Sequence, residues 1–186
     1  MEMPERRVAV ALVHYPCRDR MGAEIAASVD WVDFFDAGRV TLVYGVRPLY
    51  VVQPVEAQKA LLTRLMTHGT KDDRDADTRG RFDHAVIVDA LAEAVTHATE
   101  RFGARPTIVA TTARQADNRV SFAALRAKVQ AGEPVLVLVG KASGLADSVL
   151  QGADACLEPI SGGTGFDHLP VRGAFAIALD RLLGAP

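Results

Sequence analysis

The sequence is poor in cysteine and has no cluster of metal-binding side chains. Its two cysteines, Cys17 and Cys156, lie far apart, and neither belongs to a Cys-x-x-Cys or Cys/His motif. This pattern excludes a zinc finger and a thioredoxin-like redox site, so we expect both thiols to be reduced. The five histidines show no His-Glu-x-x-His spacing. We therefore assign them surface or packing roles and predict no metal site.

Long apolar runs and an excess of one charge are also missing. No stretch of about 18 residues is apolar and uncharged enough to span a membrane, and the N-terminus lacks the apolar segment of a signal peptide. We expect a cytoplasmic protein.

The 21 Lys and Arg residues against 23 Asp and Glu give a net charge of −2. This balance excludes bulk attraction to nucleic acid or anionic lipid, so any surface that meets RNA must be local.

Common nucleotide-binding and catalytic motifs are absent as well. Gly140-Lys141 lacks both the earlier glycine and the following Ser or Thr of a P-loop. Gly163-Thr-Gly165 has no third glycine and stands near the C-terminus, whereas the Rossmann fingerprint follows the first strand. No serine lies in a Gly-x-Ser-x-Gly motif. The sequence therefore carries none of the usual motifs of an ATP site, an NAD site or a serine-hydrolase site.

The chain has the length and composition of one globular domain, which we place at residues 1–186. It is 49% hydrophobic and 24% charged. Apolar segments of strand length alternate with helical patterns, and two polar segments are expected to be loops. The expected strands are 8–13, 49–52, 86–88, 107–110, 135–139 and 153–157. The expected helices are 28–44, 54–68, 89–102, 121–131 and 169–183, with Ser28 capping the first and Ser121 the fourth. The expected loops are 17–27 and 70–81.

This alternation predicts an α/β fold, a mainly parallel sheet with helices on both faces and a ligand site outside the carboxyl ends of the strands. The last helix is apolar or small on nearly every side, and its charges are Arg172, Asp180 and Arg181. We predict that part of it forms a homodimer interface, so that Leu179→Arg should yield monomers or insoluble protein. A core helix in a monomer is the alternative.

Glycines gather in the last third of the chain, after the two predicted strands 135–139 and 153–157. They occur at positions 140, 144, 162, 163 and 165. Glycine lets the backbone approach a ligand closely and leaves amide and carbonyl groups free to bind it. Such backbone contacts suit an adenine or a nucleoside, although the same glycines could simply form turns.

The order of these segments resembles the three C-terminal motifs of the SPOUT superfamily of S-adenosylmethionine (SAM)-dependent RNA methyltransferases. The matching segments are Leu-Val-Gly-x-x-x-Gly-Leu (138–145), Ala-Asp-x-x-Leu-Glu-Pro-Ile (153–160) and His-Leu-Pro-Val-Arg-x-Ala-x-Ala-Ile (168–177). Two further segments are similar to the SpoU-type tRNA methyltransferases: Ala110-Thr-Thr-Ala-Arg114, and Arg39 followed by Tyr44-Gly45-Val46. The match spans about residues 8–184 and is closest to a small bacterial SPOUT group.

The resemblance implies a C-terminal trefoil knot in which the last helix passes through a preceding loop. It also implies a homodimer whose SAM pocket lies at the knot. Carried over position by position, it predicts a cofactor-binding set of Thr111, Leu138, Gly140, Gly144, Leu157, Ile160, Leu169 and Val171.

Candidate catalytic and RNA-binding residues come from the resemblance, from the start of the last helix and from the clustering of arginines in loops. Methyl transfer requires alignment of donor and acceptor and a group that removes a proton. Asp167 and His168 are the candidates for proton removal, although Asp167 could instead cap the last helix. Arg39 is expected to face the RNA, with a helix pair to Asp36 as its alternative. The predicted phosphate contacts are Arg18, Arg20, Arg114 and Arg119, with Arg74, Arg79 and Arg81 in a segment that could equally be a solvated loop.

Three positions depart from the SpoU pattern. Trp31 and Pro170 occupy the positions of two asparagines, which argues against ribose 2′-O-methylation, and Lys141 stands where relatives often carry glycine or an acidic residue. The main hypothesis is a SAM-dependent methyltransferase acting on tRNA or rRNA. The alternatives are a non-catalytic dimer that binds SAM or RNA, and a Rossmann-like nucleotide enzyme.

Overall fold

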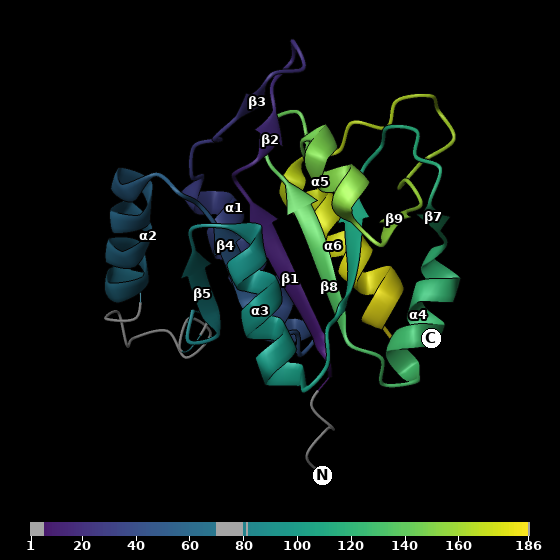
Figure 1. Ribbon diagram of the computed structural model, residues 1–186, viewed down its shortest axis with the longest axis horizontal. Helices are drawn as coiled ribbons and strands as arrows, with labels where there is room; N and C mark the ends of the chain where they lie inside the picture. The colour runs from purple at the N-terminus through teal and green to yellow at the C-terminus, as the bar shows by residue number, and fades with distance from the viewer. Residues whose placement is uncertain (1–5, 70–79, 81, 186) are drawn as a thin grey trace.

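A seven-stranded parallel sheet forms the centre of the computed structural model, which describes residues 6–69, 80 and 82–185 (Figure 1). Its strand order is β5-β4-β1-β8-β6-β9-β7, and every pairing is parallel. The strands are β1 (Val8–Val13), β4 (Leu49–Val52), β5 (Ala85–Val88), β6 (Thr107–Thr111), β7 (Arg119–Val120), β8 (Val135–Gly140) and β9 (Ala155–Leu157). The predicted α/β class with a mainly parallel sheet is confirmed.

The central strands β1 and β8 are apolar throughout because both of their faces are covered. Val8 pairs with Val135 and Val13 with Gly140, so the two strands run in register over their whole length. Alternate residues of each strand belong to two separate hydrophobic clusters, one on each face of the sheet. Continuous apolar runs are typical of strands buried in this way.

Helices cover both faces of the sheet, as predicted. One cluster contains residues of α1 (Trp31–Val43), α4 (Phe122–Gln130) and α6 (Val171–Leu183), together with Leu62 of α2 (Glu56–Gly69). The other contains residues of α3 (Leu91–Phe102) and α5 (Asp147–Gly152). Figure 1 shows α3 and α5 in front of the sheet and α1 and α6 behind it. Helix α6 packs between α1 and α4.

The N-terminal caps of two helices differ from the prediction, and helix boundaries differ by up to about three residues. Helix α1 is capped by Asp30, whose Oδ1 accepts hydrogen bonds from the amides of Val32 (2.8 Å) and Asp33 (3.3 Å), and not by Ser28. Helix α6 has Pro170 at its N-cap position and no side-chain cap, so the interpretation of Asp167 as its cap is wrong. Ser121 caps α4 as predicted.

Several short elements were not expected. The expected loop 17–27 contains an antiparallel pair, β2 (Cys17–Arg18) with β3 (Glu24–Ile25), and neither β7 nor α5 was predicted. Elements of two to six residues are too short to display a periodic pattern, which is why they were missed. The predicted loop 70–81 lies almost entirely outside the described residues.

Both cysteines are buried and free, which confirms the expectation of reduced thiols. Burial raises the pKa of the Cys17 thiol above its usual value. Among the described residues, no helix is long and apolar enough to cross a membrane.

Candidate functional site

A tight turn follows β8 at the edge where the carboxyl ends of the strands meet. A Cβ atom on Gly140 would lie 2.5 Å from the Leu145 nitrogen, so only glycine fits this position. Gly144 has a φ of +104°, and Ala142 has a φ of +51°, which is unusual for a residue other than glycine. The predicted glycine-rich loop is therefore a closed, strained turn rather than an open one.

Backbone hydrogen bonds fix this turn against the β2 segment. The Ser143 amide donates to the Arg18 carbonyl (3.0 Å), and the Arg18 amide donates to the Gly144 carbonyl (2.9 Å). The Gly144 amide donates to the Lys141 carbonyl (2.8 Å). Both backbone groups of Gly144, one of the predicted cofactor-binding residues, therefore already have partners within the chain.

The side chain of Lys141 is buried within the protein. Its ammonium group pairs with the Asp33 carboxylate of α1, and the two side chains are 9% and 12% exposed. His14 lies at the end of β1, and burial, with the nearby Lys141 charge, lowers the pKa of its imidazole to about 4. His14 is therefore neutral at pH 7. Lys141, which departs from the SpoU pattern, is therefore paired with a buried carboxylate of the same chain.

Two of the predicted cofactor-binding residues are held by side chains of neighbouring strands. The Thr111 hydroxyl donates to the Leu138 carbonyl (2.9 Å), which links the ends of β6 and β8. The Arg119 guanidinium donates to the Leu157 carbonyl (3.0 Å) and to the Arg114 carbonyl. These bonds involve the four adjacent strands β8, β6, β9 and β7.

Three of the arginines predicted to contact RNA form hydrogen bonds to this edge of the protein. Arg114 donates to the Asp147 carboxylate and to the Leu145 carbonyl (2.6 Å), while Arg18 reaches the same carboxylate at 3.3 Å. The hydrogen bond from Arg114 lowers the pKa of Asp147. With Arg119, these side chains hold the site's loops in place, which the sequence could not indicate.

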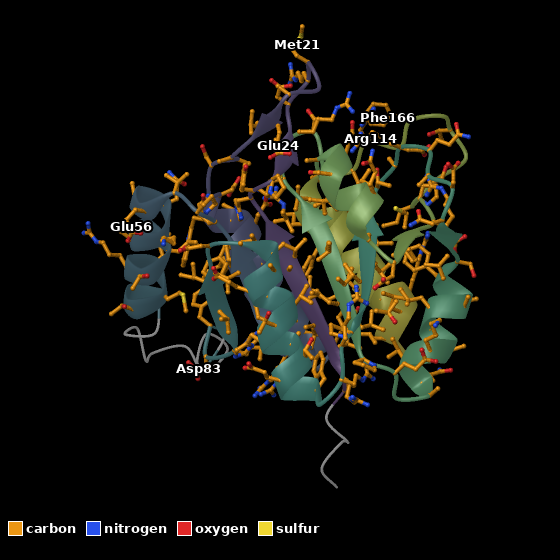
Figure 2. The ribbon with its side chains drawn as sticks, in the orientation of Figure 1. Met21, Glu24, Glu56, Asp83, Arg114 and Phe166 are labelled. Atoms are coloured by element: carbon orange, nitrogen blue, oxygen red, sulfur yellow. The ribbon has the colours of Figure 1, made fainter. Side chains whose placement is uncertain are left out.

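Arg20 is the exception. It lies exposed on the β2–β3 hairpin, next to Met21, and Figure 2 shows Met21 at the far tip of the molecule, on the same edge as Arg114 and Phe166. Arg74, Arg79 and Arg81 lie outside the described residues.

The segment 161–170, between β9 and α6, is exposed except at Asp167, which is half-buried. The Phe166 ring is 72% exposed and stands edge-on to the His168 ring, with centroids 5.6 Å apart. Asp167 Oδ1 is buried and has no hydrogen-bond partner in the structure. This oxygen can therefore accept a hydrogen bond from a ligand or from water.

Unpaired backbone amides lie near Asp167 in the sequence. Within the described chain, the amides of Ile160, Leu169 and Val171 have no hydrogen-bond acceptor. All three belong to the predicted cofactor-binding set. Like Asp167, they lie within residues 160–171 of the chain, and their amides are free to bind a ligand.

Arg39 lies in a groove of about 460 Å³ between α1 and α6, apart from these atoms. The groove is lined by Asp36, Arg39, Val40, Val43, Tyr44, Arg172, Gly173 and Ala176. Neither Asp167 nor His168 contributes to it. No ion pair joins Arg39 to Asp36 among the described residues, so the alternative given for Arg39 is not observed.

Trp31, one of the departures from the SpoU pattern, is a packing residue. Its ring lies 5.3 Å from that of Phe35 and 5.7 Å from that of Phe82, within a cluster that also contains Phe34.

The Asp33–Lys141 pair was missed by the sequence analysis. A lysine directly after a buried strand is a signal that a carboxylate partner is needed, but the sequence does not reveal which carboxylate it is.

Known proteins resemble this chain in sequence over nearly its whole length. A tRNA (guanine-N(1)-)-methyltransferase of Oleidesulfovibrio alaskensis is 37% identical over 188 residues, covering 98% of this chain and 43% of the relative. An uncharacterized protein of Aquifex aeolicus is 32% identical and covers 97% of this chain and 90% of the relative. The chain thus spans less than half the length of the methyltransferase relatives that it matches.

A solved structure and a family model complete the comparison. A SpoU methyltransferase from Streptomyces viridochromogenes, in complex with AdoMet, shares the fold with a TM-score of 0.61 at 15% identity, covering 98% of this chain and 58% of that chain. The model of a family described as SAM-dependent RNA methyltransferase matches residues 7–184. The resemblance found in the sequence is therefore confirmed, and the chain belongs to the SAM-dependent RNA methyltransferase family.

Proposed function

We propose that this chain methylates tRNA, with SAM bound at the carboxyl edge of the sheet beside Asp167. The observation that supports this most directly is the buried, unpartnered Oδ1 of Asp167 within a segment whose neighbouring amides are also unpaired. The name of the Oleidesulfovibrio relative favours tRNA over rRNA as the substrate. A methylated base rather than a ribose agrees with Trp31 and Pro170 at the positions of the SpoU asparagines.

The predicted cofactor-binding residues divide into two groups. Ile160, Leu169 and Val171 offer free amides and are the direct contacts in this proposal. The remaining five residues shape the pocket in this proposal, since their hydrogen bonds and close approaches lie within the chain; they are Thr111, Leu138, Gly140, Gly144 and Leu157. SAM supplies an electrophilic methyl group when it is bound. The protein must then align the acceptor atom and remove its proton.

Asp167 is the group that we assign to proton removal. Its free Oδ1 can accept a hydrogen bond from a ring N–H of a base, which places the carboxylate at the proton that has to leave. His168 lies next to it, and the exposed Phe166 ring beside His168 offers a surface on which an unstacked base can lie. Arg20 on the β2–β3 hairpin provides the local phosphate contact.

We further propose that 1–186 is one domain and that it forms a homodimer through α1 and α6. Val43 of α1 is 77% exposed and lines the groove with Ala176 of α6, so the groove is apolar and unpaired in the single chain. Arg39 lies in the same groove, and this arrangement places it at the subunit boundary. The trefoil knot is proposed as well, with support from α6 lying between α1 and α4 directly after segment 161–170.

A non-catalytic dimer that binds SAM or RNA is the second candidate function. The strained turn at Ala142 and the departure at Lys141 favour it, because both lie in the segment that matches a cofactor motif. Such a protein would bind SAM without transferring its methyl group.

Calorimetric titration tests the cofactor assignment. We expect the purified chain to bind SAM and S-adenosylhomocysteine and not NAD or ATP. Amide chemical shifts measured during the same titration should change at Ile160, Leu169 and Val171. Preferential binding of NAD or ATP, or shift changes confined to the groove between α1 and α6, would contradict the proposal.

A further inference from the structure

A buried ion pair lies beneath the turn that follows β8. The Lys141 ammonium group contacts the Asp33 carboxylate, and both side chains are nearly nine-tenths or more buried. Removing two charges from water is costly, and a buried pair usually stabilises a protein no more than two apolar side chains of the same size would. The pair is therefore better explained by the geometry that it fixes than by the stability that it adds.

The backbone of Lys141 is fixed at the same point. Its amide donates to the Val13 carbonyl (3.2 Å) and its carbonyl accepts from the Gly144 amide (2.8 Å). With the ion pair, these bonds hold Lys141 to β1, to the turn itself and to α1. The next residue, Ala142, adopts a φ of +51°, which costs free energy and persists only where the surroundings enforce it.

The pair also joins this turn to the helix that carries Arg39. Asp33 lies in the first turn of α1, and Arg39 follows six residues later, which is about 9 Å along the helix axis. Further charges act on the same helix start. Burial raises the pKa of Asp30, but amide hydrogen bonds and the charges of Lys141 and Arg172 lower it below its usual value. The start of α1 is thus held between the turn and α6.

We propose that Lys141 and Asp33 are positioning residues for the methyltransferase site. Their ion pair holds the 140–145 turn in the shape that receives the adenosyl cofactor. The same pair sets the distance between this turn and Arg39. Neither side chain touches the cofactor or the RNA in this scheme. The inference rests on the proposed function for its cofactor, but the shape of the turn can be measured without one.

Four variants test the pair. Lys141→Met removes one charge, and the double variant Asp33→Leu/Lys141→Met replaces both charges with apolar groups of similar size. Lys141→Arg keeps the charge. Lys128→Met is the matched control, because Lys128 of α4 forms an exposed ion pair with Glu133 (3.2 Å), which precedes β8, whereas the turn follows the other end of that strand. The measurements are the melting temperature, hydrogen exchange at the Ser143 and Gly144 amides, the SAM dissociation constant and the KM for RNA.

We expect Lys141→Met to raise amide exchange at Ser143 and Gly144 and to raise the SAM dissociation constant by about tenfold or more. The KM for RNA should stay within about twofold. The double variant should regain the wild-type melting temperature without regaining amide protection or SAM affinity. Lys141→Arg should retain most of the amide protection and of the SAM affinity. Lys128→Met should match the wild type in every measurement.

Two results would overturn the inference. One is a folded Lys141→Met protein with unchanged amide protection and SAM affinity. The other is a double variant that recovers the melting temperature, amide protection and SAM affinity together, because the pair would then act only as a packing element. If the wild type binds no SAM, the proposed function fails, whereas the amide exchange of the variants still decides whether the pair holds the turn.

Discussion

Single side chains at the carboxyl edge of the sheet have partners that their sequence positions do not reveal. His14, Asp33 and Lys141 come from three separate elements and meet beneath one turn. His84 is buried elsewhere in the core, where its Nε2 lies 2.7 Å from the Thr41 hydroxyl. Both histidines have packing roles, as the sequence analysis expected, and both have consequences for stability.

The two buried histidines should make stability depend on pH. Burial lowers the pKa of both His14 and His84 from 6.5 to about 4, so between these values the unfolded chain binds more protons than the folded one. The free energy of unfolding should therefore decrease as the pH falls from about 6.5 towards about 4, by about 3 kcal/mol for each histidine. Urea unfolding at several pH values measures this slope. In His14→Gln it should be shallower, and an unchanged slope would contradict the role of His14.

Replacement of Asp167 should separate catalysis from cofactor binding. Asp167→Asn keeps the size of the side chain but removes the proton acceptor, so we expect kcat to fall by about 100-fold or more. The SAM dissociation constant should change by less than about threefold. Single-turnover methyl transfer and calorimetry measure the two effects. A variant with wild-type kcat would show that another group removes the proton.

At the scale of elements, strand and helix types were largely predictable, whereas their connections were not. The runs 8–13 and 135–139 are apolar without interruption, and both are buried central strands. The helix 169–183 was also correct in type, but the sequence could not show which of its faces is buried. Leu179 is 1% exposed and belongs to the core, so Leu179→Arg tests folding rather than a dimer interface.

The interface between subunits is better tested at Ala176, on the groove side of α6. Ala176→Arg places a charge where α1 and α6 should meet their copies in a second subunit, and we expect it to shift a dimer to monomers without unfolding it. Ala127→Arg, on the exposed side of α4, is the matched control and should leave the dimer intact. Light scattering and the melting temperature measure both outcomes. A dimer that survives Ala176→Arg would place the interface elsewhere.

Arg119 should act on the cofactor site rather than on RNA. Arg119→Lys keeps the positive charge but loses the planar fork that bonds the Leu157 and Arg114 carbonyls together. We expect weaker SAM binding with little change in RNA affinity. Arg105→Lys is the control, because Arg105 forms an exposed pair with Asp154 (2.9 Å) that involves none of the site's residues. The opposite pattern, with RNA binding lost and SAM binding kept, would restore Arg119 as a phosphate contact.

For the whole molecule, the fold class and the family could be inferred from one sequence. The candidate functional site could be inferred only in part. Motif order predicted that the three C-terminal motif segments lie at one edge of the sheet, because the carboxyl ends of parallel strands converge there. The arginines were assigned to RNA because charge in a loop indicates exposure. Arg18, Arg114 and Arg119 also bond to carboxylate and carbonyl groups distant in sequence, and periodicity carries no information about such contacts.

Transfer of a labelled methyl group from SAM to unmodified tRNA is the most direct test of the account. We expect the purified chain to label tRNA, and we expect Asp167→Asn to bind SAM while labelling tRNA far more slowly. Binding of SAM without labelling of tRNA or rRNA would contradict the assignment as an active methyltransferase and would favour the non-catalytic dimer.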